Sequence, residues 1–281
     1  GVLLGACPAA TLQLHLSDAG GAFLPLGTRR GTADLAGARL ALYLTVWDEE
    51  TAAFLEAPLG VFFVTDAVGQ KPGCALRLTA MDALGLHFDG SFSDPLSYPA
   101  TLGQIAAAIA LQAGADAPAP FPGSDFSIPA APRWQGASLR RALGYVCAAA
   151  GCFAHMNRQG RLTLSPVRDP DAAHPFSIGP DDTLSRVYSD LRLGPVRGLS
   201  VFLHQPPRDA EDDVLLAADD TGIAPDEVLS IRRNPLFPYG GSHCENLARA
   251  AFLRLKGLCM ARALVRWRGD PTVELGRALQ L

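Results

Sequence analysis

The stretch Ser138–Leu164, SLRRALGYVCAAAGCFAHMNRQGRLTL, predicts a helix that runs directly into a β-hairpin. Its first half places apolar side chains on one helical face, at Leu139, Ala142, Leu143, Val146 and Ala150. Ser138 can accept a hydrogen bond from a free backbone N–H at the start, and Gly151 can end the helix in a left-handed conformation. We therefore expect a helix with defined ends.

The second half of this stretch has the pattern of two short strands. Cys152–Met156 and Arg161–Leu164 are the strands, and Asn157–Gly160 forms the turn between them. Leu162 and Leu164 share one face of the hairpin. A helix that feeds a tight hairpin can bury its apolar stripe on that face, which predicts a small α+β unit.

Length and composition limit the function classes. The chain has 281 residues, 48% of them hydrophobic, which is enough for two domains with packed cores. The net charge of −4 argues against a protein whose main task is to bind nucleic acid. No run of about 18 apolar residues predicts a membrane span, and no signal peptide is expected. The six cysteines include no C-x-x-C pair, which favours buried free thiols over disulfides.

The N-terminal part reads as short antiparallel strands. The expected strands are Thr11–Leu16, Arg39–Trp47, Leu59–Thr65 and Ala75–Ala80. The expected turns are Asp18–Gly21, Ala57-Pro58 and Gln70–Gly73. In the second strand one face is predicted to carry Leu40, Leu42, Leu44 and Val46, and the other Tyr43, Thr45 and Trp47. Such strands suggest a barrel or sandwich.

Two further helices are expected beyond these strands. Thr101–Gln104 has the pattern of a capping box before an apolar stripe that ends near Gly114. Residues 115–136 predict a surface crossover, which we expect to be anchored by Phe121, Phe126 and Trp134. Ser242–Glu245 predicts a second capping box, for a helix over residues 243–258.

The last part of the chain predicts a second set of strands. Arg168–Asp182 is expected to be a loop. The expected strands are Leu184–Leu193, Gly198–His204 and Glu227–Arg232, with a solvated acidic stretch over Asp209–Asp220.

The motif around the hairpin resembles a segment of tail proteins from phages and prophages of Gram-positive bacteria, in the baseplate hub or tail hub family. The matching residues are Gly151, Phe153, Ala154, Asn157, Arg158, Gly160, Leu162 and Leu164. Three more passages are similar to that family and occur in the same order: PLGVFFVTDA with LTAMDALGLHFD (58–67 and 78–89), Asn234-Pro235-Leu236, and the closing VRWRGDPTVELGRALQL (265–281). Arg277 stands where the family usually has Asp.

The resemblance implies an α+β fold with two antiparallel β-barrel-like domains and an α/β insert. The expected boundaries are 1–95, 96–167 and 168–281. It also implies a homotrimeric ring in the virion tail, made in the host bacterial cytoplasm, that joins tail-tube and tail-tip proteins around a DNA channel. We expect no stable sequence-specific nucleic-acid binding and no membrane insertion.

Several carboxylates and thiols in the sequence are candidates for chemical sites, and each also has a possible structural role. The carboxylates of the acidic stretch lack the D-x-D-x-D-G spacing of a calcium loop. Asp82 and Asp89 are expected to cap or turn the chain rather than act as a hydrolytic pair. Cys147 and Cys152 near His155 are expected to be buried thiols. We therefore predict no catalytic, cofactor or metal residues, no cofactor and no hydrolytic activity.

Two alternatives stay open, together with one basic cluster. The chain is alternatively the hub portion of a tail-associated cell-wall hydrolase or peptidase, or a carbohydrate-binding tail-tip module. The basic cluster can contact an anionic partner or simply be solvated, and it comprises Arg133, Arg140, Arg141, Arg158 and Arg161.

Overall fold

A computed structural model describes residues 4–17, 35–69, 75–167, 176–179, 183–193, 195–205, 210–219, 222–239, 242–267, 273, 275 and 279–280. The helices are α1 (Ala83–Leu86), α2 (Leu102–Gln112), α3 (Leu139–Ala150) and α4 (His243–Leu255), with a 3-10 turn at Pro225–Glu227. The strands are β1 (Thr11–Ser17), β2 (Arg39–Asp48), β3 (Ala53–Gly69), β4 (Ala75–Met81), β5 (Ala100–Thr101), β6 (Ser127–Ile128), β7 (Cys152–Met156), β8 (Leu162–Pro166), β9 (Phe176–Ser177), β10 (Thr183–Leu193), β11 (Gly198–Gln205), β12 (Ala210–Ala218), β13 (Val228–Ile231), β14 (Met260–Trp267) and β15 (Leu279–Gln280).

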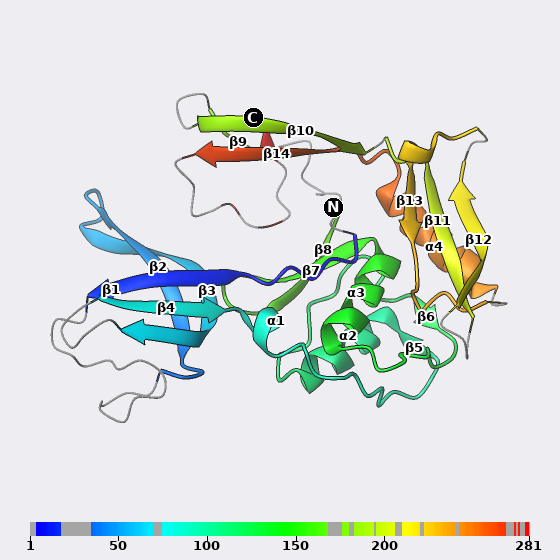
Figure 1. Cartoon of the computed structure of the whole chain (residues 1–281), viewed down its shortest axis with the longest axis horizontal. Coiled ribbons are helices and arrows are strands. Elements are labelled where there is room, and N and C mark those ends of the chain that lie inside the picture. The colour runs from blue at the N-terminus through cyan, green and yellow to red at the C-terminus, as the bar shows by residue number, and fades with distance from the viewer. Residues whose placement is uncertain are drawn as a thin grey trace.

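These elements form separate regions along the molecule's long axis (Figure 1). The sheet of β1–β4 lies at the left of the view, and α1, α2 and α3 lie in the lower middle. The sheet of β11–β13 lies at the right with α4, while β10 and β14 run along the top.

The helix and hairpin predicted from Ser138–Leu164 are confirmed. The Ser138 side chain accepts a bond from the backbone N–H of Arg141, and Gly151 ends α3 with φ 72°. All five predicted stripe residues of α3 are buried. β7 and β8 pair antiparallel, and Leu162 and Leu164 are buried on the hairpin.

The first predicted capping box and the crossover are also as expected. The Thr101 N–H donates to Gln104 Oε1 at 2.8 Å, and the Gln104 N–H donates to Thr101 Oγ1 at 3.1 Å. Phe121 and Trp134 of the crossover are buried, while Phe126 is half-buried. The Trp134 indole N–H donates to Asp94 at 2.8 Å, which satisfies its polar atom in the core.

The N-terminal sheet has the strand order β1-β4-β3-β2 and is antiparallel throughout. β3 is long enough to pair with two strands in succession. Its second half pairs with β4 from Phe63 onward, and its first half pairs with β2 as far as Ala53. Because β4 ends at Met81, opposite Phe63, β2 and the first half of β3 continue beyond it as a two-stranded ribbon.

The predicted turn at Ala57-Pro58 is wrong. Both residues lie within β3, and the turn falls at residues 49–52 instead. Pro58 is tolerated because, among the described residues, β3 has no second neighbouring strand there and the register shifts beside it, between Leu42 and Tyr43. The predicted turns at 18–21 and 70–73 lie outside the described residues.

The C-terminal strands divide among separate sheets. β10 pairs with β14, and β9 pairs with β15. The third sheet has the order β12-β11-β13, in which β11 and β13 run parallel. Mixed α+β structure is therefore confirmed, and Leu40–Val46 and Leu199–Leu203 lie in different sheets. Within the described ranges both strand blocks form open sheets, so the two-barrel arrangement stays a proposal.

The second predicted capping box is wrong. Ser242 adopts helical φ and ψ of −61° and −24°, and its side chain makes no capping bond. A capping side chain needs an extended backbone at this position to reach the free N–H groups. α4 also ends at Leu255 rather than at residue 258, and Gly257 follows with φ 75°.

The main core runs through the middle of the molecule and into α4. It extends from Leu84 on α1, through α2 and α3, to β11, β13 and Leu255 on α4. A smaller core around Val64, Leu76 and Leu78 lies in the N-terminal sheet. The three-part division at 1–95, 96–167 and 168–281 stays a prediction, and α4 shares its core with the insert helices.

Leu143→Ala should lower the free energy of unfolding by about 2–5 kcal/mol, because the side chain is fully buried in α3. Gly151→Val should also destabilise the protein, since a β-branched residue resists a positive φ. Denaturant unfolding measures both effects. Leu111→Ala, at a position 66% exposed on α2, is the control, and equal stability of all four proteins would contradict the described packing.

Candidate assembly site

The ribbon of β2 and β3 exposes large apolar side chains in water. We call Tyr43–Pro58 the arm. Its exposed large apolar side chains, with their exposed fractions, are Tyr43 (53%), Leu44 (38%), Val46 (53%), Trp47 (51%), Phe54 (65%) and Leu55 (56%). Monomeric soluble proteins rarely gather so many apolar side chains on one element, and such patches usually mark interaction sites.

Both faces of the arm are apolar. Val46 is paired with Leu55, and Trp47 with Phe54, so the strand alternation puts these pairs on opposite faces. The rings of Trp47 and Phe54 meet edge to face with centroids 4.9 Å apart. Leu44 lies on the face of Val46. The prediction that Leu44 and Val46 share a face is confirmed, but that face is exposed rather than covered by a core.

The arm gains stability only when something covers it. An isolated two-stranded ribbon is marginal in water. Full burial of one large apolar side chain contributes about 1.5–3 kcal/mol. The arm therefore has the properties of a surface that inserts between or against other protein surfaces.

The tip of the arm is acidic. Asp48, Glu49 and Glu50 lie at the turn, and Thr51 Oγ1 donates to Asp48 Oδ2 at 2.6 Å. The Glu50 N–H donates to Asp48 Oδ1 at 3.2 Å. The bonds from the Thr51 hydroxyl and the Glu50 backbone lower the pKa of Asp48, so this carboxylate is charged at neutral pH.

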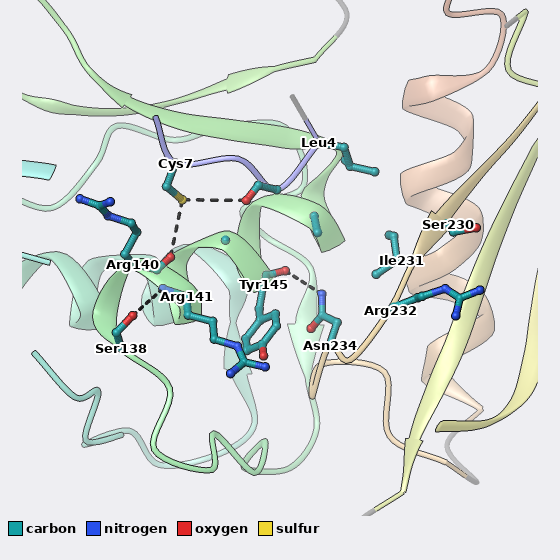
Figure 2. Close-up of a pocket in the computed structure, with 13 residues that line it drawn as sticks. Leu4, Cys7, Ser138, Arg140, Arg141, Tyr145, Ser230, Ile231, Arg232 and Asn234 are labelled. Atoms are coloured by element: carbon teal, nitrogen blue, oxygen red, sulfur yellow. Dashed lines mark hydrogen bonds between the residues drawn. The ribbon is translucent and has the colours of Figure 1, made fainter. Parts of the chain in front are cut away.

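A groove of about 480 Å³ opens near the middle of the molecule, between the N-terminal segment, α3 and β13 (Figure 2). Leu4 and Cys7 line one side, Gly144 and Tyr145 of α3 the floor, and Ile231 of β13 the other side. A smaller hollow adjoins it, shares Tyr145 with it and is lined by Trp134 and His204 among others.

Arginines surround this groove. Arg140, Arg141 and Arg232 line the larger part, and Arg133 and Arg233 line the adjoining hollow. No residue that lines either part is acidic, and all of them belong to the described portion of the chain. We call the two together the arginine groove. Its electrostatic character is that of a site for a negatively charged group.

The groove arginines are held by specific contacts. The Arg232 guanidinium lies 3.8 Å from the ring centre of Phe202, and that of Arg141 lies 5.5 Å from the ring centre of Tyr145. The Arg140 guanidinium donates to the Leu84 carbonyl at 2.5 Å. Stacking on an aromatic face leaves the in-plane N–H groups of a guanidinium able to meet a carboxylate.

A buried asparagine joins the two walls of the groove. The Asn234 side-chain N–H donates to the Tyr145 carbonyl at 2.9 Å, and its oxygen accepts from the Leu236 N–H at 3.0 Å. Asn234 is 1% exposed. These bonds fix the chain after β13 against α3, so the groove is preformed.

The structure divides the basic cluster predicted from the sequence. Arg133 and Arg141 line the smaller hollow, and Arg140 and Arg141 line the larger one. Arg158 instead reaches β3 and the C-terminal part, where it donates to the Val273 carbonyl at 2.6 Å and to the Pro58 carbonyl at 3.5 Å. Arg161 is exposed near the same turn and lines neither part of the groove.

Sequence reasoning missed the arm and two of the groove arginines. The available signal for the arm was that Leu40–Trp47 carries no charged residue and has apolar side chains on both faces of the strand. The alternation of side chains alone does not show whether another element covers either face. Arg232 and Arg233 directly precede the Asn234-Pro235-Leu236 motif, which was the available signal for them.

Some of the residues considered as chemical sites make structural contacts. Asp82 caps α1 by accepting from the N–H groups of Gly85 and Ala10, each at 2.8 Å, while Asp89 is exposed. Asp219 of the acidic stretch forms ion pairs with Arg249 and Lys256. Across the described ranges no group of His, Cys, Asp and Glu is arranged to hold a metal ion.

The thiols near His155 are buried and protonated. His155 Nε2 lies 3.0 Å from Ser165 Oγ, and its ring stacks on Phe153. Burial raises the pKa of Cys147, and it raises that of Cys152 to about 12. A thiol with a raised pKa is a poor nucleophile.

In the part of the chain that the structure describes, no helix combines the length and the hydrophobicity that crossing a membrane requires.

Comparisons with known proteins give structural matches only. No family model matches the sequence, and neither does any curated protein. The chain is similar to the 43 kDa tail protein of prophage MuSo2 from Shewanella oneidensis, with 15% identity and a TM-score of 0.47 over 88% of this chain and 69% of that one. A tail protein from Neisseria meningitidis MC58 gives 13% identity and a TM-score of 0.47 over 88% of this chain and 66% of that one.

A third match is the prophage tail protein gp18 from Listeria monocytogenes EGD-e. It gives 12% identity and a TM-score of 0.42 over 80% of this chain and 73% of that one. The chain thus spans about two thirds to three quarters of the length of these solved structures. All three are tail proteins by description.

A thiol reagent at pH 8 should modify Cys259 quickly and leave Cys147 and Cys152 unmodified in the folded protein. Cys259 is exposed, whereas burial keeps the other two thiols protonated well above pH 8. Mass spectrometry of the modified peptides measures this, with the unfolded protein as the control. Rapid modification of Cys152 in the folded protein would contradict its assigned structural role.

Trp47→Ser combined with Phe54→Ser should weaken association of the protein at least about tenfold, because two large apolar side chains lose their burial. Both are exposed, so the melting temperature should stay close to that of the original protein. Analytical ultracentrifugation measures the association. The matched control is Leu111→Ser with Leu253→Ser, which removes two exposed leucines elsewhere, and an equal loss in the control would mean that the arm has no special role.

Proposed function

We propose that this protein is a structural component of a phage or prophage tail, similar to the hub ring that joins the tail tube to the tail tip. Its work is assembly, and its partners are further copies of itself and the neighbouring tail proteins. In this proposal three copies form the ring around a channel, and the two strand blocks of each chain act as barrel-like units.

The arm is the observation that carries the proposal. Six large apolar side chains are exposed on its two faces, whereas no other helix or strand in the described part of the chain exposes more than two. Exposure on both faces suits an element that becomes enclosed in an assembly better than one that binds a soluble small molecule on one side. A subunit of a large particle needs such an element.

The hub-like motif also has a structural explanation in this chain. Gly151 ends α3, and Asn157 Oδ1 accepts from the N–H groups of Gln159 and Arg161 at the hairpin turn. A Cβ on Gly160 would lie 2.7 Å from the Cβ of Val61 on β3, so only glycine permits this approach. These residues therefore fix the hairpin against the N-terminal sheet.

Arg158 strengthens the same joint. Its guanidinium contacts the Pro58 carbonyl at the base of the arm and the Val273 carbonyl. The joint sets the direction in which the arm leaves the molecule, which matters in a ring where every copy must present its arm in the same way. A motif built from joint residues supports an architectural function.

The test is to locate the protein in particles released by the strain that carries its gene. Gold-labelled antibodies should bind at the distal end of the tail, and a strain that lacks the gene should release no complete tails. Complementation with the Trp47→Ser and Phe54→Ser variant should fail, and complementation with the Leu111→Ser and Leu253→Ser variant should succeed. Complete tails without this protein would contradict the proposal.

A further inference from the structure

We infer that the acidic tip of the arm of one copy docks in the arginine groove of the next copy. This inference rests on the proposed tail function, and it names the partner of the arm. The contact is head-to-tail, since two different surfaces meet.

Charge complementarity is the first support. The arm, residues 43–58, contains four carboxylates and no lysine or arginine. Three of the four, on Asp48, Glu49 and Glu50, lie at the tip. Five arginines and no carboxylate are among the lining residues of the arginine groove, and of these Arg140 turns its guanidinium away toward the Leu84 carbonyl. Guanidinium and carboxylate groups form paired hydrogen bonds. The pairing fixes the relative orientation of the two groups and adds to their electrostatic attraction.

Apolar complementarity is the second support. Beside its arginines the groove is lined by Leu4, Ala148 and Ile231 and by the Tyr145 ring (Figure 2). Its volume of about 480 Å³ can receive several side chains. An apolar ribbon with a charged end matches an apolar groove with a charged rim.

Strand edges provide the third support. β2 is the outer strand of the N-terminal sheet, and β13 is the outer strand of the sheet that borders the groove, as far as the described residues show. Outer strands carry backbone N–H and C=O groups that can pair with another chain. The arm therefore offers a strand edge to a groove that has one of its own.

The occupant must come from a second copy. The arm lies at the left of Figure 1, while α3 and β13 lie to the right of its centre. The arm of one chain thus cannot fill the groove of that same chain. Contacts between two different surfaces close into a ring when the rotation between neighbours permits it.

The experiment reverses the charges on each side separately and then on both. The tip variant is Glu49→Lys with Glu50→Lys, and Asp48 is kept because it holds the turn. The groove variant is Arg141→Glu with Arg232→Glu. Each should weaken association about tenfold or more in analytical ultracentrifugation at low salt. The chain that carries all four substitutions should associate nearly as tightly as the original, because the pairing is restored with its signs exchanged.

Two controls separate this contact from a general effect of net charge. Arg77→Glu with Arg161→Glu changes the charge as the groove variant does, at exposed positions outside the groove. Asp89→Lys with Asp116→Lys matches the tip variant at exposed positions outside the arm. Both controls should associate like the original protein, and thermal melts should show that every variant is folded.

Mixing the tip variant with the groove variant gives a further readout. One retains an intact groove and the other an intact arm, so the mixture should stop at a dimer with one productive contact. A four-substitution chain that associates no better than the single-side variants would overturn the inference. A groove variant that associates normally would also overturn it. So would an original chain that stays monomeric up to its solubility limit. Because these assays use only the purified chain, their failure is distinguishable from failure of the tail function, which depends on the particles.

Discussion

The length of β3 is the constraint on which the rest of the structure depends. β3 has 17 residues, whereas its neighbour β4 has 7 and ends opposite Phe63. Beyond that point β2 is the one described strand that pairs with β3, so the two leave the sheet as a two-stranded ribbon. Within the described ranges no core lies beneath the ribbon, and its apolar side chains are exposed as a direct consequence of this mismatch.

The second determinant is the joint between the ribbon and the helical centre. The hairpin of β7 and β8 packs against α3, and its turn meets β3 through the close approach of Gly160 to Val61. The main core then continues from α3 to β13 and α4, where Asn234 bonds to the Tyr145 carbonyl. The arm and the groove are thus connected through one continuous body, and their relative orientation is set by packing.

Local structure was predictable where a few neighbouring residues decide it. The ends of α3 followed from Ser138 and Gly151, and the start of α2 followed from Thr101 and Gln104, since capping depends on contacts within three or four residues. The prediction of a capping box at Ser242 was wrong because the same sequence pattern is equally compatible with a serine that already has helical backbone angles.

Long-range arrangement was not predictable in the same way. Pro58 predicts a turn in isolation, and only the absence of a strand beside it makes it compatible with β3. The alternation of Leu44 and Val46 gives their shared face correctly but does not show whether another element covers it. Arg232 and Arg233 are distant in sequence from Arg141, and packing of β13 against α3 alone brings them together.

Backbone hydrogen exchange, compared between the dilute monomer and the assembled protein, tests the central claim that the arm is the assembly surface. The account predicts that amides of residues 43–58 exchange quickly in the monomer, because a ribbon of only two strands opens readily, and become strongly protected on assembly. The amides that line the arginine groove should gain protection together with them. Assembly that protects other surfaces while residues 43–58 continue to exchange at the monomer rate would contradict it.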